Sequence, residues 1–217
     1  MQIPILFQDN RFVVLDKPAG LKVHAGPGGG PSVEDYFPAL SRRKDGPWLA
    51  HRLDADTSGC LVVALRRAAL LAAQAEFAAG RAEKTYWAVV GGVPAGESGV
   101  VDAPLLKCHD RAGWRMVVDA AGQAAVTEWR VMGRADGLTW LELRPRTGRT
   151  HQVRAHAAAL GCPLLGDGIY GDRAGDAKLH LLARAIRLAL DPAVSAVAPV
   201  PTHMAPALRR CGWSPAG

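Results

Sequence analysis

The chain has 217 residues, 49% of them hydrophobic, which is enough to bury one core and near the upper end of what one domain holds. Its 26 Lys and Arg residues outnumber its 20 Asp and Glu residues, and the net charge of +6 favours an anionic partner, most often nucleic acid. No stretch approaches the ~20 apolar residues of a membrane span, and no secretory signal follows Met1, so we expect a cytoplasmic protein.

The cysteines are widely scattered and form no Cys-x-x-Cys pair. Neither a zinc ribbon nor a disulfide framework is indicated, and reduced thiols are expected. The positions are Cys60, Cys108, Cys162 and Cys211.

The chain begins with a predicted hairpin. Residues 3–7 and 12–15 are β-prone runs separated by a polar turn. Ser32, with Asp35 three residues later, can cap a short helix that ends near Pro38.

Residues 50–59 form a polar segment that leads into the apolar run 60–65. The pattern predicts a loop at the end of a buried strand, and loops held by rigid strands often carry catalytic groups. Asp54 is therefore a candidate catalytic carboxylate. The alternative that the residues leave open is a solvated ion pair between Arg52 and Asp54, followed by a simple turn.

The next element expected is a helix over residues 67–79, with Gly80 as its stop signal. A series of strands then follows without intervening helices, which favours antiparallel pairing. The expected strands are residues 84–90, 100–101, 115–118, 125–131 and 138–143.

The last third of the chain should add a helix over residues 150–160, capped by Thr150. Residues 179–190 fit either period and are assigned to a strand, and residues 206–213 suggest a short helix. We expect one α+β domain spanning residues 1–217, with a largely antiparallel mixed sheet and flanking helices.

The densest cationic cluster lies at residues 144–156, at the expected strand-to-helix junction. Arginines at a helix N-terminus are repelled by the positive end of the helix dipole, and a bound anion offsets that repulsion. A phosphate site is therefore favoured over a solvated basic face. Arg154, one turn into the helix, could instead face an internal carboxylate.

Several other chemistries are disfavoured. His151 and His156 are five residues apart and do not share a helix face, so no metal site is predicted. Ser58 lacks the glycine two residues earlier that a nucleophile elbow needs. A hydrolase that uses Asp54 with His51 remains an alternative, but it rests on one loop.

Tyr86 and Trp87 alternate faces of the expected strand at residues 84–90. One aromatic ring can fill the core while the other is free to stack on a base, although core packing is the commoner role for an aromatic residue in a strand.

Five motifs, taken together and in this order, resemble the RluA-type branch of the pseudouridine synthases. They are residues 16–24, His-Arg-Leu-Asp at 51–54 with Thr-Ser-Gly at 57–59, Glu-Lys-Thr-Tyr at 83–86, residues 147–156, and residues 161–167 with Tyr-Gly at 170–171. The resemblance implies an enzyme that isomerises uridine to pseudouridine in structured RNA, ribosomal or transfer. It also implies a central active-site cleft and no metal or organic cofactor.

The resemblance also implies roles for single residues. Asp54 is the nucleophile, Tyr86 lies next to the base, and Arg154 pairs with the catalytic Asp, while Asp56 is a neighbour at a variable position. We expect a monomer without a separate N-terminal RNA-binding domain. The residues expected to contact RNA are Arg42, Arg43, Lys44, Arg52, Arg146, Arg149 and His151.

The chief rival is a catalytically silent RNA-binding protein on the same fold. The presence of Asp54, Tyr86 and Arg154 together argues against it, because a silent relative has no need to keep all three.

Overall fold

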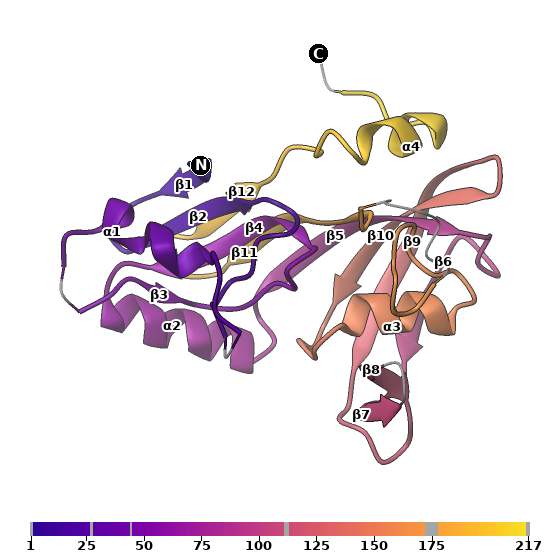
Figure 1. The fold of residues 1–217 in the computed structure, drawn as a ribbon, viewed down its shortest axis with the longest axis horizontal. Helices are drawn as coiled ribbons and strands as arrows, with labels where there is room; N and C mark the ends of the chain where they lie inside the picture. The colour runs from indigo at the N-terminus through magenta and orange to yellow at the C-terminus, as the bar shows by residue number, and fades with distance from the viewer. Residues whose placement is uncertain (1, 27, 44, 111–112, 172–177, 216–217) are drawn as a thin grey trace. The chain divides into compact units, whose positions relative to one another are not determined.

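The computed structural model describes residues 2–26, 28–43, 45–110, 113–171 and 178–215 (Figure 1). The chain divides into two compact units, each built from two separate stretches. Unit 1 is Met1–Lys84 with Leu182–Pro199, and unit 2 is Thr85–Leu181 with Val200–Gly217. The expectation of a single catalytic domain over residues 1–217 stays a prediction.

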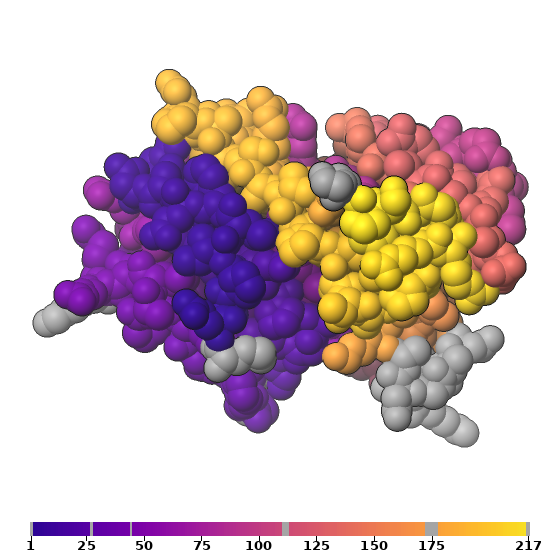
Figure 2. All heavy atoms as spheres, turned by 90° about the horizontal axis from the view of Figure 1, so that it is seen from above, coloured from indigo at the N-terminus to yellow at the C-terminus, as the bar shows by residue number. Residues whose placement is uncertain are grey.

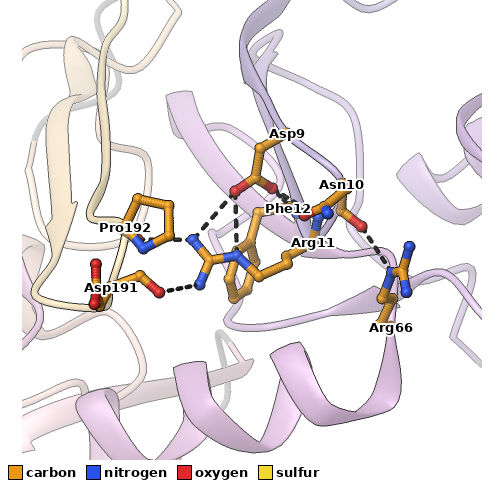
Figure 3. Close-up of polar contacts among 7 residues, drawn as sticks. All are labelled: Asp9, Asn10, Arg11, Phe12, Arg66, Asp191 and Pro192. Atoms are coloured by element: carbon orange, nitrogen blue, oxygen red, sulfur yellow. Dashed lines mark hydrogen bonds and ion pairs between the residues drawn. The ribbon is translucent and has the colours of Figure 1, made fainter.

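The predicted hairpin opens unit 1. Strands β1 (Ile5–Gln8) and β2 (Phe12–Lys17) pair antiparallel. The Asp9 carboxylate closes the turn by accepting the backbone N–H groups of Arg11 at 2.7 Å and Phe12 at 2.6 Å. Figure 3 shows the Arg11 guanidinium reaching the carbonyl oxygens of Asp191 and Pro192, so the turn is tied to the late stretch of the chain.

The centre of unit 1 is strand β4, which is buried along its whole length. It pairs antiparallel with β2 and β3 and parallel with β11, and β12 pairs antiparallel with β11. β1 also lies beside β12, where the start of the chain meets its late stretch (Figure 2). The bounds are β3 (Trp48–Leu49), β4 (Ser58–Ala64), β11 (Leu181–Leu188) and β12 (Val194–Val197).

Helices cover the strands of unit 1. α2 (Arg67–Ala78) lies along β4 and ends just before Gly80, whose φ of +69° suits a residue without a side chain (Figure 1). The short helix expected near Pro38 is a 3-10 turn, η1 (Val33–Tyr36), continued by α1 (Phe37–Leu40). Pro38 lies in the first turn of α1, where its missing N–H is not needed.

Unit 2 contains most of β5 and the strands β10, β9 and β6, which neighbour one another in that order and are all antiparallel. β7 and β8 form a separate two-stranded ribbon. The bounds are β5 (Glu83–Gly91), β6 (Ser98–Asp102), β7 (Leu105–Asp110), β8 (Gly113–Val118), β9 (Val126–Ala135) and β10 (Leu138–Pro145).

The helices of unit 2 are α3 (Gln152–Ala159), which packs on β8, β9 and β10, and α4 (Ala205–Arg210) near the end of the chain (Figure 1). The α+β class with mostly antiparallel strands is thus confirmed. Strands β3, β7 and β12 were not predicted. In the described residues, none of the helices is long and apolar enough to cross a membrane.

Candidate active site and RNA-contact residues

Asp54 lies in the loop of unit 1 that leads into β4. The backbone N–H of Thr57 donates to the Asp54 carbonyl oxygen at 3.2 Å and closes a turn, and Thr57 and Ser58 are buried behind it. Asp54 is half-buried, whereas Asp56 is exposed. The two carboxylates of the loop therefore have different surroundings.

Lys17 anchors this loop from inside. Its side chain is fully buried, and the ammonium group donates to the carbonyl oxygens of Pro18 at 2.9 Å, Leu21 at 2.8 Å and Ala55 at 2.7 Å. Burial lowers the pKa of Lys17 to about 8, while the charges of Asp56 and Asp54 act to raise it. Sequence reasoning found the Asp-Lys-Pro-Ala-Gly motif but assigned Lys17 no role.

His51, at the start of the same loop, supports β4. Its Nε2 atom accepts the backbone N–H of Val62 at 3.0 Å, and its ring lies 5.0 Å from that of Phe77. Burial, and to a lesser extent the charge of Lys84, lowers the pKa of His51 to about 4, so the ring is neutral and carries its proton on Nδ1. This arrangement favours a structural role for His51 over the base of a hydrolase.

The structure also describes the surroundings of Gly59 and Lys84, two further residues of the motifs. Gly59 has a φ of +106°, and a Cβ there would overlap the carbonyl group of Ala183, because β11 runs directly beside it. Lys84, at the start of β5, is a second lysine whose pKa burial lowers to about 8. Lys84 belongs to the motif at residues 83–86, but the sequence predicted no role for it.

Arg154, in α3 of unit 2, is 5% exposed and faces an internal carboxylate. Its Nε donates to Asp167 Oδ2 at 2.8 Å and its Nη2 to Oδ1 at 2.7 Å, and Asp167 is fully buried. Burial by itself raises the pKa of Asp167, but Arg154 and the backbone amides of Ile169 and Tyr170 together hold that pKa below its ordinary value. The expected pairing of Arg154 with Asp54 stays a prediction.

The start of α3 differs from the expected cap. His151, not Thr150, is the N-cap residue, and its φ of +52° is in the left-handed region. The Gln152 side chain stabilises the turn before the helix, since its Oε1 accepts the Arg149 backbone N–H at 2.9 Å and the Thr147 hydroxyl at 2.7 Å. The expected Thr150 cap is therefore wrong, because the helix begins at Gln152 and the residue before it, His151, is the N-cap.

Tyr86 lies in β5 opposite Leu143, half-buried and packed against the core of unit 2. Trp87 packs edge-on against Trp140, with ring centroids 4.7 Å apart, and its Nε1 donates to Glu142 at 3.4 Å. The role of Tyr86 next to a base remains a prediction.

The basic residues expected to contact RNA have different surroundings in the two units. In unit 2, Arg146 makes two hydrogen bonds to Glu128, at 2.9 and 3.0 Å, while the Nε of Arg149 donates to the Ala124 carbonyl at 3.0 Å. In unit 1, Arg42 and Arg52 are exposed and Arg43 lies 3.3 Å from Asp45; Lys44 lies outside the described residues.

Among residues 2–26, 28–43, 45–110, 113–171 and 178–215, no group of three or more His, Cys, Asp or Glu side chains is placed to hold a metal ion. The cysteines carry free thiols, and Cys60, Cys162 and Cys211 are buried.

Comparison with known proteins gives a consistent result. Residues 11–159 match the family model described as RNA pseudouridylate synthase. An uncharacterized RNA pseudouridine synthase of Zymomonas mobilis is 39% identical over 91% of this chain and 93% of its own length. The ribosomal large subunit pseudouridine synthase C of Haemophilus ducreyi is also 39% identical, over 81% of this chain but only 55% of its own length.

Among solved structures, human RNA pseudouridylate synthase domain containing 4 superposes with a TM-score of 0.80 at 30% identity, covering 95% of this chain and 92% of that one. Human RNA pseudouridylate synthase domain containing 1 has a TM-score of 0.76 at 25% identity.

Proposed function

Because the chain belongs to the RluA-type branch of the RNA pseudouridylate synthase family, which is a family of isomerases, we propose that it converts uridine to pseudouridine in RNA with Asp54 as the nucleophile. The observation that supports Asp54 most directly is its setting. It is a half-buried carboxylate in a loop anchored by the buried Lys17 ammonium, next to an exposed Asp56.

The reaction needs a group that can hold one fragment of the nucleoside while the other turns. The bond between N1 of uracil and C1′ of the ribose breaks, the base rotates, and C5 bonds to C1′; the C5 proton is then lost and N1 gains a proton. An ionised carboxylate can act as the covalent nucleophile in such a sequence. We assign Tyr86 to stacking on the uracil ring and to the proton removal, and Arg154 to keeping the nucleophile anionic.

Ribosomal RNA is the proposed first substrate, and transfer RNA the second. The support comes from the names of relatives such as the ribosomal large subunit pseudouridine synthase C of Haemophilus ducreyi, of which this chain spans 55%. The target uridine has to leave the helical stack to be reached, so a loop or a flipped base is expected. We further propose that the protein acts in the cytoplasm as a monomer.

Tritium release tests the reaction, because the hydrogen on C5 of uracil is lost only if C5 forms the new bond. Purified protein should release tritium from ribosomal or transfer RNA transcripts labelled at C5 of uridine. Mapping pseudouridines in a strain that lacks the protein against its parent then identifies the uridine. RNA binding without tritium release from either class of transcript would instead support the silent RNA-binding protein.

A further inference from the structure

An aromatic stack projects from the β7–β8 ribbon of unit 2. The indole of Trp114, in β8, stacks on the imidazole of His151, with ring centroids 4.7 Å apart and an interplanar angle of 24°. Trp114 is 39% exposed, and the ammonium group of Lys107 in β7 lies over the indole at 4.8 Å from the ring centroid. The stack thus presents a large apolar ring to solvent with a positive charge on it.

His151 is held firmly beneath this ring. Its Nδ1 lies 3.1 Å from the Tyr170 hydroxyl, which also accepts the backbone N–H of Met116 at 2.9 Å. The Tyr170 ring in turn lies edge-on to His151 at 5.8 Å and carries the Arg154 guanidinium at 5.3 Å from its centroid. A left-handed backbone is unusual for a residue other than glycine, and these contacts maintain it at His151.

The ribbon carries a cation on each of its two faces. Trp114 pairs with His109, and Met116 pairs with Lys107, so these four side chains share one face of the ribbon. Arg115 lies on the other face and is exposed. An exposed indole with a lysine ammonium beside it resembles the sites on which proteins stack unpaired bases, because every base offers a π-face and every linkage a phosphate.

We propose that Trp114 is a stacking site for an unpaired base of the RNA that the proposed function requires. The base takes the place of the Lys107 ammonium on the indole, and the flexible Lys107 side chain moves to the adjoining phosphate. Stacking tolerates any base, so the site adds affinity for single-stranded segments and leaves the choice of the uridine to other contacts.

The test compares Trp114→Ala, Trp114→Phe and the control Val118→Ala, which shortens an exposed apolar side chain on the same strand. The ligand is a fluorescein-labelled single-stranded oligouridine, measured by anisotropy. Trp114→Ala should raise the Kd about 5- to 100-fold, Trp114→Phe should raise it less, and Val118→Ala should leave it unchanged. With an abasic ribose-phosphate oligomer of the same length, wild type and Trp114→Ala should bind equally.

Equal Kd values for wild type and a folded Trp114→Ala on oligouridine would overturn the proposal, as would the same loss of affinity on the abasic oligomer. If Trp114→Ala does not fold, the quenching of tryptophan fluorescence by oligouridine is compared between Trp114→Phe and the wild type. The quenching caused by oligouridine should be smaller than in wild type, and equal quenching would overturn the stacking site. Tritium release by the wild type is scored separately, so a protein that stacks RNA on Trp114 without making pseudouridine would refute only the proposed function.

Discussion

Lys17 and Ala55 are joined in the interior of unit 1, where the fully buried Lys17 ammonium donates to the Ala55 carbonyl oxygen at 2.7 Å. The same carbonyl oxygen accepts the backbone N–H of Gly20 at 2.9 Å. Ala55 directly follows Asp54, so the backbone that carries the proposed nucleophile is fastened to the end of β2 by a buried cation.

Replacing that cation should destabilise the protein. Lys17→Met keeps the length of the side chain but removes three hydrogen bonds from the buried ammonium group to carbonyl oxygens, so we expect a loss of roughly 2–4 kcal/mol in the free energy of unfolding, measured by urea denaturation. Lys22→Met is the matched control, because Lys22 is exposed and should tolerate the change. Equal stability of the two variants would refute the anchoring role.

The pH dependence of stability should contain a contribution from His51. Its pKa is about 4 in the folded protein and 6.5 ordinarily, so the unfolded chain binds more protons between these values. The contribution of neutral His51 to the free energy of unfolding is therefore fully present above pH 6.5. Up to ~3 kcal/mol of it is lost as the pH falls towards 4.

His51→Gln should show less of this acid sensitivity, because the Gln side chain can accept the Val62 N–H without titrating. Urea denaturation at pH 7 and pH 4.5 measures the difference for each protein. Other groups that titrate in acid are common to both proteins and cancel in the comparison. Parallel pH profiles would show that His51 is not buried in its neutral form.

The two carboxylates of the loop should differ in their effect on turnover. Asp54→Asn should lower tritium release by about 1,000-fold or more, because an amide cannot serve as the nucleophile, with little change in melting temperature or RNA affinity. Asp56→Asn is the control for the exposed neighbour and should remain active. Turnover like that of wild type in Asp54→Asn would remove the proposed mechanism.

The ion pair between Arg154 and Asp167 should be important for folding. Asp167→Asn removes the buried carboxylate that accepts two hydrogen bonds from the buried Arg154 guanidinium, which should cost roughly 3–5 kcal/mol in the free energy of unfolding. Asp136→Asn is the control, because it breaks an exposed ion pair. The Arg210 side chain is 53% accessible and that of Asp136 is 69% accessible, so the change should cost less than ~1 kcal/mol. A small effect of Asp167→Asn, measured by urea denaturation, would contradict this view of the pair.

RNA affinity should fall steeply with salt if arginines neutralise phosphates. Arg149→Gln should make the plot of log K against log salt shallower, reducing the magnitude of its slope by about 1. The full charge of Arg149 is available to a phosphate, since no carboxylate in the described part of the chain pairs with it. Arg146→Gln should have a smaller effect, because Glu128 already shares that charge. A flat salt response of the wild type would remove the phosphate role from this cluster.

Local patterns predicted most of the regular structure. The run at residues 12–15 and the stop at Gly80 are set by neighbours in the chain, and both were found. β7 was missed because a two-stranded ribbon with an exposed face needs little apolar alternation. The cap of α3 was misassigned because His151 takes the N-cap position with a left-handed backbone, and its contacts with Trp114 and Tyr170 form only in the folded protein.

The sequence by itself determined the family and the candidate residues, because short motifs such as His-Arg-Leu-Asp hold their chemistry within a few positions. Only the tertiary structure decided how those residues are supported. Lys17 anchors the carbonyl of a residue 38 positions away, and Arg154 meets the buried Asp167. Trp114 stacks on His151. Such contacts join segments that are far apart in the chain. A local sequence pattern therefore cannot identify the partner of a buried charge or of an exposed aromatic ring.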